Sequence, residues 1–203
     1  MSDFLFRYHH SPHDFSCYSK ELRTCDLCGN LSSGYQGGVF YGDIDIEFVC
    51  ETCLINGKLA EKQVFTNSGN LHELKIQIRE KQPNLSILEV ERLAQAKDDE
   101  LIHRTPTVIT WQDFHWPIHC ADYCCFIKEA GKPDILEIAP KGRTHLLFHP
   151  RDERFSSDDE EFWQWFDNIR PDSPDDKSVS YSIGVYLFQC LNCQEYLALW
   201  DCD

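Results

Sequence analysis

Eleven cysteines are the residues of this 203-residue chain whose types and spacing most clearly indicate chemistry. Four of them form two C-x2-C pairs, Cys25–Cys28 and Cys50–Cys53, on either side of a glycine-containing stretch that ends in alternating, strand-like residues. This spacing is typical of a zinc ribbon, in which two tight turns joined by a β-hairpin each present two thiolates to one ion. Gly29 follows Cys28 and suits a turn position with positive φ. We therefore predict a four-cysteine metal site here.

A third pair, Cys190–Cys193, lies near the end of the sequence and needs two further ligands. On a helix, Cys120 and Cys124 would lie one turn apart on the same face, whereas Cys125 would point about 100° away. We predict that a helix supplies Cys120 and Cys124 and that a strand–turn–strand supplies Cys190 and Cys193, which completes a second tetrahedral site. His119 or Cys125 could replace one of these ligands, and a cluster of buried free thiols is the alternative.

Both predicted sites have four protein ligands. Four thiolates fill the tetrahedron of a structural zinc ion, whereas catalytic zinc keeps an open position and commonly has His or carboxylate ligands. We therefore expect two structural zinc ions and no catalytic residues at either site. Iron is the alternative at the first site, but only the first of its two C-x2-C pairs is followed by glycine. Cys17 and Cys202 have no close partner in the sequence, and we interpret them as ordinary thiols.

The elements that position these thiols predict an α+β fold. We expect a zinc-ribbon-like module with short antiparallel strands at 1–65 and a mixed module of helices and a β-hairpin at 66–203, closed by the second site. Ser86 and Glu89 form a capping box at the start of an amphipathic helix. The apolar face of this helix is predicted to consist of Ile87, Val90, Leu93 and Ala94.

Charge and hydropathy limit the possible partners. The formal net charge is −15, from 34 acidic and 19 basic residues. Such a field repels nucleic acids and anionic membranes and favours a basic partner, although acidity can also serve solubility alone. No apolar run reaches the roughly 18 residues of a membrane span, and the first residues do not resemble a signal peptide. We therefore expect a cytoplasmic protein, and in the cytosol disulfides are rare and clustered cysteines more often bind metal or carry out redox chemistry.

A strongly acidic segment with several aromatic residues is the predicted contact surface for a basic partner. Ser157 and Glu160 match a second capping box, which predicts a short helix up to about Ile169. Acidic residues in the first turn suit the positive end of the helix dipole. The candidate partner-binding residues are Asp158, Asp159, Glu160, Glu161, Trp163 and Trp165.

Several motifs together resemble a known bacterial family, the CbrC family. They are the Phe6–Pro12 segment, the C-x2-C-G turn, Gly38–Tyr41, Arg104–Pro106, Trp111–Gln112, the H-C-x-D-x-C-x-F block at 119–126, and the segment from Phe188 to Asp201 that contains the last cysteine pair. In that block the family pattern aligns Cys124 and not Cys125. The resemblance implies a role in colicin tolerance, a protection against bacterial toxins, and supplies no set of catalytic residues.

Three hypotheses of function follow from the sequence. The leading one is a non-enzymatic, zinc-stabilised immunity or tolerance protein that binds a basic toxin, such as a nuclease. The second is an enzyme that uses polar residues beside the second cysteine group, namely Arg104, His115, His119 and Asp122. The third is a nucleic-acid-binding module, which the acidity disfavours because no basic patch longer than a few residues is present.

Overall fold

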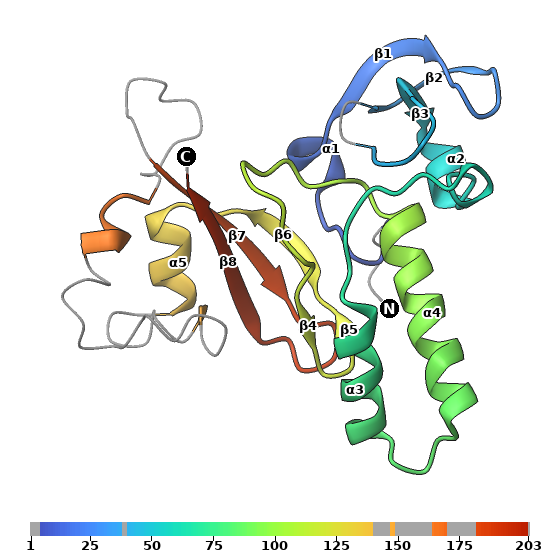
Figure 1. The fold of residues 1–203 in the computed structure, drawn as a ribbon. Coiled ribbons are helices and arrows are strands. Elements are labelled where there is room, and N and C mark those ends of the chain that lie inside the picture. Colours follow the sequence, from blue (N-terminus) through green and yellow to red (C-terminus); the bar gives the residue numbers. More distant parts are fainter. Residues whose placement is uncertain (1–4, 38–39, 140–146, 149–163, 170–181, 203) are drawn as a thin grey trace.

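The computed structural model describes residues 5–37, 40–139, 147–148, 164–169 and 182–202. Within these residues the chain forms three small antiparallel sheets with helices between them (Figure 1). The predicted α+β fold class is therefore confirmed. The division into modules at 1–65 and 66–203 stays a prediction.

The first sheet carries the first two cysteine pairs and has the strand order β1-β2-β3. Its elements are α1 (Pro12–Phe15), β1 (Tyr18–Thr24), β2 (Leu31–Gln36) and β3 (Phe48–Cys50). The predicted hairpin between the two pairs is present as β2 and β3, where Tyr35 lies opposite Val49. Two short helices follow the sheet, α2 (Glu51–Ile55) and the 3-10 helix η1 (Ala60–Lys62). The hairpin thus brings two distant cysteine pairs to one side of a small sheet.

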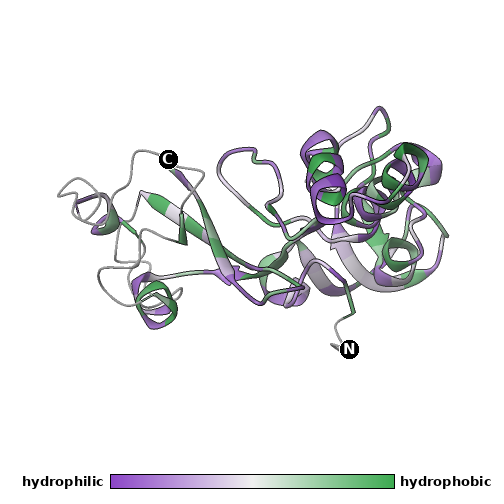
Figure 2. Ribbon diagram, turned by 90° about the horizontal axis from the view of Figure 1, so that it is seen from below, coloured by the Kyte–Doolittle hydropathy of each residue, from purple (hydrophilic) through white to green (hydrophobic). Residues whose placement is uncertain are grey.

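Two antiparallel helices form the middle of the chain, α3 (Leu71–Lys81) and α4 (Ile87–Arg104). The capping box at the start of α4 is confirmed, because the Ser86 hydroxyl accepts from the Glu89 N–H and the Glu89 carboxylate accepts from the Ser86 N–H. In Figure 2 both helices carry hydrophilic and hydrophobic residues around their turns, as amphipathic helices do.

The apolar face predicted for α4 is only half correct. Val90 and Ala94 are buried, but Ile87 and Leu93 are 66% and 38% exposed. The buried residues of the helix are Val90, Ala94, Asp98 and Leu101. They are spaced four, four and three residues apart and therefore lie on one face of the helix. This buried face is narrower than the apolar face predicted from the sequence.

The segment around Cys120 is a β-hairpin, so the predicted helix is wrong. Strands β4 (Ile118–His119) and β5 (Asp122–Tyr123) pair with each other across a two-residue turn. Both turn residues, Cys120 and Ala121, have positive φ angles, of 55° and 62°. A right-handed helix needs negative φ at every position, whereas a two-residue hairpin turn of type I′ needs positive φ at both of its central residues.

The third sheet has the order β6-β7-β8 and contains the last cysteine pair. Its elements are β6 (Cys125–Glu129), β7 (Ile183–Gln189) and β8 (Tyr196–Cys202), and helix α5 (Lys132–Ile138) follows β6. β7 is the central strand and is buried from Ile183 to Phe188. The turn that joins β7 to β8 holds Cys190–Cys193 and points toward the β4–β5 hairpin (Figure 1).

An extended segment near the start of the sequence connects the cores of the molecule. The Phe126 N–H donates to the Tyr8 carbonyl and the His10 N–H donates to the Phe126 carbonyl, both at 2.9 Å, so this segment lies along the edge of β6. Phe6 belongs to the core beneath the first sheet, whereas Tyr8 belongs to the core that α3, α4 and β6 share. Packing of this segment therefore couples the two cores.

One buried carboxylate holds the start of the chain, α4 and the β4–β5 hairpin together. Asp122 is 3% exposed and accepts from Arg7 at 2.7 Å, from Tyr8 at 2.8 Å and from Lys97 at 2.8 Å. Burial opposes ionisation, but the hydrogen bonds and charges of Lys97 and Arg7 lower the pKa of Asp122 below its usual value. The carboxylate is thus ionised and paired at neutral pH.

No helix in the described part of the chain is long and apolar enough to cross a membrane.

We expect Asp122→Asn to lower the free energy of unfolding by roughly 2–3 kcal/mol, because two cations lose their buried counter-charge. The estimate is below that for a fully buried pair because the Arg7 side chain is half exposed. Urea denaturation measures the change. The control is Asp99→Asn, an exposed carboxylate on the same helix as Lys97, which should change stability by less than about 0.5 kcal/mol. Equal losses of stability in both variants would contradict the role of Asp122. The metal content of each variant is also measured, so that destabilisation through loss of a metal ion can be distinguished from loss of the ion pairs.

Candidate metal centres

Cys25, Cys28, Cys50 and Cys53 converge on one point, so the first predicted quartet is brought together. Their sulfur atoms all lie within 4.8 Å of one another, and the Sγ atoms of Cys28 and Cys50 are 3.8 Å apart. Three of the four residues are buried and Cys28 is half-buried. The group comes from the turn after β1, the end of β3 and the first turn of α2.

Backbone hydrogen bonds fold the first C-x2-C pair into a tight turn. The Gly29 N–H donates to the Cys25 carbonyl at 2.8 Å, and Gly29 has a φ of +73°, as its place in the sequence predicts. The carboxylate of Asp26 accepts from the N–H groups of Glu47 and Phe48, which fixes the turn against β3. The Cys50 N–H donates to the Cys25 sulfur at 3.3 Å. The thiols are therefore positioned by the backbone itself.

The electrostatics of this group suit a bound cation. The hydrogen bond from the Asn30 backbone lowers the pKa of the Cys28 thiol to about 7, whereas burial raises the pKa of Cys50 and Cys53. Buried thiolates are costly unless a positive charge lies among them. Four convergent sulfurs with one half-exposed member fit a soft metal ion that enters from the solvent side.

The second group has a different composition from the predicted quartet. Ligand atoms of His119, Cys120, Cys190 and Cys193 lie within 4.8 Å of one another, and the Cys193 sulfur is 3.3 Å from His119 Nδ1. The β4–β5 hairpin supplies His119 and Cys120, and the β7–β8 turn supplies the cysteine pair. One imidazole and three thiols are a ligand set known from structural zinc sites.

Cys124, the fourth ligand predicted from the spacing, lies outside this group, so the structure does not bring it together with Cys120, Cys190 and Cys193. Cys124 is fully buried in the main core, and its backbone carbonyl accepts from the Trp116 indole N–H at 2.7 Å. In a helix it would share a face with Cys120, but across a hairpin turn the two side chains separate. His119, the replacement left open by the sequence, lies at the end of β4 beside Cys120. Cys125 is also buried outside the group, and burial raises its pKa to about 12.

Neighbouring groups orient the second site. Although burial opposes it, the N–H groups of Cys193 and Asn192 and a hydrogen bond with His119 lower the pKa of Cys190 to about 7. The other ring nitrogen of His119, Nε2, is 3.5 Å from the Glu195 carboxylate. A carboxylate on the far nitrogen of a ligating histidine fixes its ring orientation, so the Nδ1 atom faces the thiols.

The remaining candidates from the sequence are dispersed. Asp158, Asp159, Glu160, Glu161 and Trp163 lie outside the described residues. Trp165 is half-buried and packs edge-on against Phe148 and Trp200, with ring centroids 5.2 and 5.1 Å apart. Trp165 therefore belongs in large part to the core beneath the third sheet.

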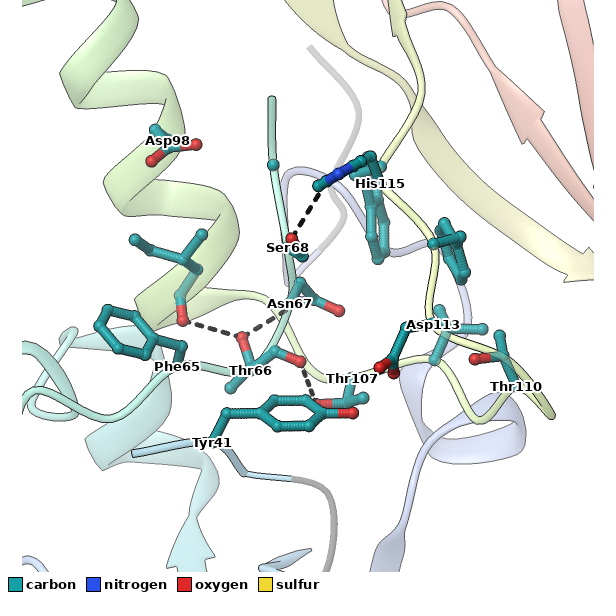
Figure 3. A pocket seen from close by; sticks show the side chains of 15 residues that line it. Tyr41, Phe65, Thr66, Asn67, Ser68, Asp98, Thr107, Thr110, Asp113 and His115 are labelled. Atoms are coloured by element: carbon teal, nitrogen blue, oxygen red, sulfur yellow. Dashed lines mark hydrogen bonds between the residues drawn. The ribbon is translucent and has the colours of Figure 1, made fainter. Parts of the chain in front are cut away.

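The four residues of the enzyme hypothesis do not form one site. His119 lies among the thiols, Asp122 is in its buried ion pairs, and Arg104 is 3.8 Å from Glu100 within α4. His115 lies elsewhere, at a cavity that the sequence did not reveal, where its Nδ1 is 3.2 Å from the Ser68 hydroxyl. Figure 3 shows this cavity between α4 and two extended segments, 65–69 and 107–116. Its wall comes from segments far apart in sequence, so no local motif marks it.

Metal stoichiometry tests the membership of the second group. By native mass spectrometry we expect two metal ions per wild-type chain and one in Cys190→Ser. In His119→Ala we expect the second ion to be lost or to bind more weakly. Each change removes a ligand atom of the second group. The matched control is Cys124→Ser, which changes a neighbouring buried thiol outside the group and should retain both ions. Loss of an ion in Cys124→Ser but not in His119→Ala would restore the quartet predicted from spacing.

The comparisons with known proteins agree on one family. The model of the Uncharacterised protein family (UPF0167) matches residues 4–202. The UPF0167 protein PA1536 of Pseudomonas aeruginosa is 22% identical over 200 residues, which cover 98% of this chain and 95% of that protein. No solved structure matches the chain. Because the family model matches almost the whole sequence, the chain belongs to the uncharacterised protein family UPF0167.

Proposed function

We propose that this protein is a non-enzymatic, zinc-stabilised binding protein that confers tolerance to a basic bacterial toxin, such as a nuclease. The observation that carries the proposal is the net charge of −15 on a chain whose two cysteine groups each offer a complete set of four ligands. Four protein ligands leave no open position on a tetrahedral ion, which argues for structural metals. The acidic surface then accounts for attraction of a basic protein.

The choice of zinc rests on the chemistry of the ligands. Thiolates and an imidazole in four-coordinate groups favour Zn²⁺ over the hard ions Mg²⁺ and Ca²⁺, which prefer oxygen. Bound zinc would act here as a cross-link that stabilises the fold. All eleven cysteines are free of disulfides, which supports a reducing, cytoplasmic location for the protein.

The resemblance to the CbrC family supports the tolerance role, through the motifs at both ends of the chain and at 119–126. The partner-binding surface of this proposal is the acidic segment from Asp158 to Trp163, at whose end the half-buried Trp165 lies. Its sequence combines carboxylates, whose charge speeds association with a basic protein, with an aromatic residue of a type that is enriched in interfaces.

An enzyme remains the second candidate function, and one contact favours it. The pairing of His115 with Ser68 at the cavity, together with the buried Asp98 in its wall, has the residue types of a proton-transfer site. Arg104, His119 and Asp122 make their contacts away from this cavity. Of the four residues of the enzyme hypothesis, the enzyme function therefore depends on His115.

The binding proposal predicts a salt-sensitive complex with the nuclease domain of a colicin. Association should slow steeply as added salt shortens the Debye length from about 10 Å at 0.1 M toward about 3 Å at 1 M. Surface plasmon resonance with a panel of purified colicin nuclease domains measures the rates. Neutralising the segment (Asp158→Asn, Asp159→Asn, Glu160→Gln, Glu161→Gln) should reduce the association rate by about tenfold or more.

The matched control neutralises four exposed carboxylates elsewhere, at Glu21, Glu61, Glu80 and Glu91. It carries the same net charge, so it should associate much faster than the segment variant. Equal rates in the two variants would refute the segment as the contact surface. The absence of a complex with every basic domain of the panel would refute the toxin-binding function itself.

A further inference from the structure

The cavity beside α4 has the size of a small-molecule site. Its volume is about 540 Å³, within the range of about 300–1,000 Å³ that is usual for ligand pockets. The walls come from Tyr41, the extended segment 65–69, α4 and the segment 107–116 (Figure 3). It lies apart from both cysteine groups, none of whose residues line it.

Hydrogen bonds join the two extended segments and α4, which form the wall of the cavity. The Asn67 amide donates to the carbonyls of Leu101 and Thr105, at 3.2 and 2.9 Å. The Thr107 hydroxyl donates to the Thr66 carbonyl at 2.6 Å, and the Trp116 N–H donates to the Ser68 carbonyl at 2.8 Å. These amide, hydroxyl and carbonyl groups already have hydrogen-bond partners within the protein. A ligand would therefore contact a preformed wall and would bond to other polar groups of the lining.

Two carboxylates, Asp98 and Asp113, are the acidic groups in the lining of the cavity, which also contains the paired side chains of Ser68 and His115. Asp98 is 9% exposed, and its Oδ1 accepts from the Tyr123 hydroxyl at 2.6 Å. Its second oxygen, Oδ2, accepts from none of the described residues, and burial raises the pKa of this carboxyl group. Asp113 lies on the opposite segment beside Tyr41, whose pKa is raised by burial and by this carboxylate. Among the described residues that line the cavity, none is Lys or Arg.

Gly69 keeps the buried carboxylate in place. A Cβ atom at this position would lie 2.5 Å from Asp98 Oδ1 and would also collide with the Tyr123 hydroxyl. The close approach of the 65–69 backbone to α4 therefore requires glycine. The backbone at Gly69 thus lies directly against the Asp98 carboxylate in the wall of the cavity.

Aromatic rings form much of the remaining wall. Tyr41 and Phe65 lie near the mouth and are 54% and 38% exposed, whereas Trp116 is buried and stacks with Phe114 at a centroid distance of 6.1 Å. The faces of such rings attract organic cations as well as apolar groups. Carboxylates and aromatic rings around one cavity, with no Lys or Arg among the described lining residues, favour a ligand with an apolar body and a positive charge.

We propose that this cavity binds a small organic cation, an ammonium group on a flat apolar body. The ammonium group would pair with Asp113 at the mouth or Asp98 in the wall, and the apolar body would pack against Phe114 and Trp116. The inference depends neither on toxin binding nor on catalysis, because it follows from the lining of the cavity alone.

Three matched probes test the proposal on the metal-loaded full chain. Phenethylamine is cationic, phenethyl alcohol is neutral, and 3-phenylpropionate is anionic, while all three share one ring and a similar length. Saturation-transfer NMR and calorimetric titration measure their binding. We expect the cation to bind at least about tenfold more tightly than the neutral probe, because one charge-assisted hydrogen bond contributes about that factor in affinity. The anion should show no binding.

Variants separate the cavity from the general acidity of the surface. Asp113 is an exposed residue, and Asp98→Asn keeps an oxygen that accepts from the Tyr123 hydroxyl, so both variants should fold. Each substitution should weaken phenethylamine binding by about tenfold. Asp99→Asn removes the neighbouring exposed carboxylate of α4 and should leave binding unchanged. Equal binding of all three probes, no binding of the cation, or equal loss in all three variants would overturn the proposal.

Discussion

The buried carboxylate of Asp122 is the interaction on which the arrangement of the molecule depends. It gathers a guanidinium from the first residues, an ammonium from α4 and a phenol from Tyr8 around one strand of two residues. A charge in such a position is stable only if every partner is present, because an unpaired buried carboxylate costs several kcal/mol. The network thereby fixes the β4–β5 hairpin against α4, and with it the turn that presents His119 and Cys120.

The two cysteine groups bring together residues that are distant in the sequence. The first group spans residues 25 to 53, and the second spans residues 119 to 193. A metal ion in each group would restrict the unfolded chain much as a disulfide does, and its binding energy would become folding energy. A two-stranded sheet is only marginally stable alone, so such a cross-link at its end would add to its stability.

The chemistry of the chain is thus divided between separate places. His119 and His115 are only four residues apart, yet one lies among thiols and the other at an acidic, aromatic cavity. Pro117 lies between them, and His119 belongs to β4 whereas His115 precedes it, so their side chains lie in different surroundings. The two cysteine groups could hold metal ions, whereas the cavity is lined by two carboxylates, Asp98 and Asp113, and by aromatic rings.

Local chemistry determined a large part of the structure from the sequence alone. The C-x2-C-G turn, the capping box at Ser86 and the hairpin between the first cysteine pairs depend on residues close in sequence, whose geometry follows from spacing and backbone preference. The membership of His119 in the second group, the burial of Cys124 and the narrow buried stripe of α4 were decided by the tertiary structure. A C-x3-C spacing is compatible with a helix or a hairpin, and only the pairing of β4 with β5 and the anchoring of Asp122 select between them. The cavity likewise depends on packing between segments that are about 40 residues apart, which no local pattern encodes.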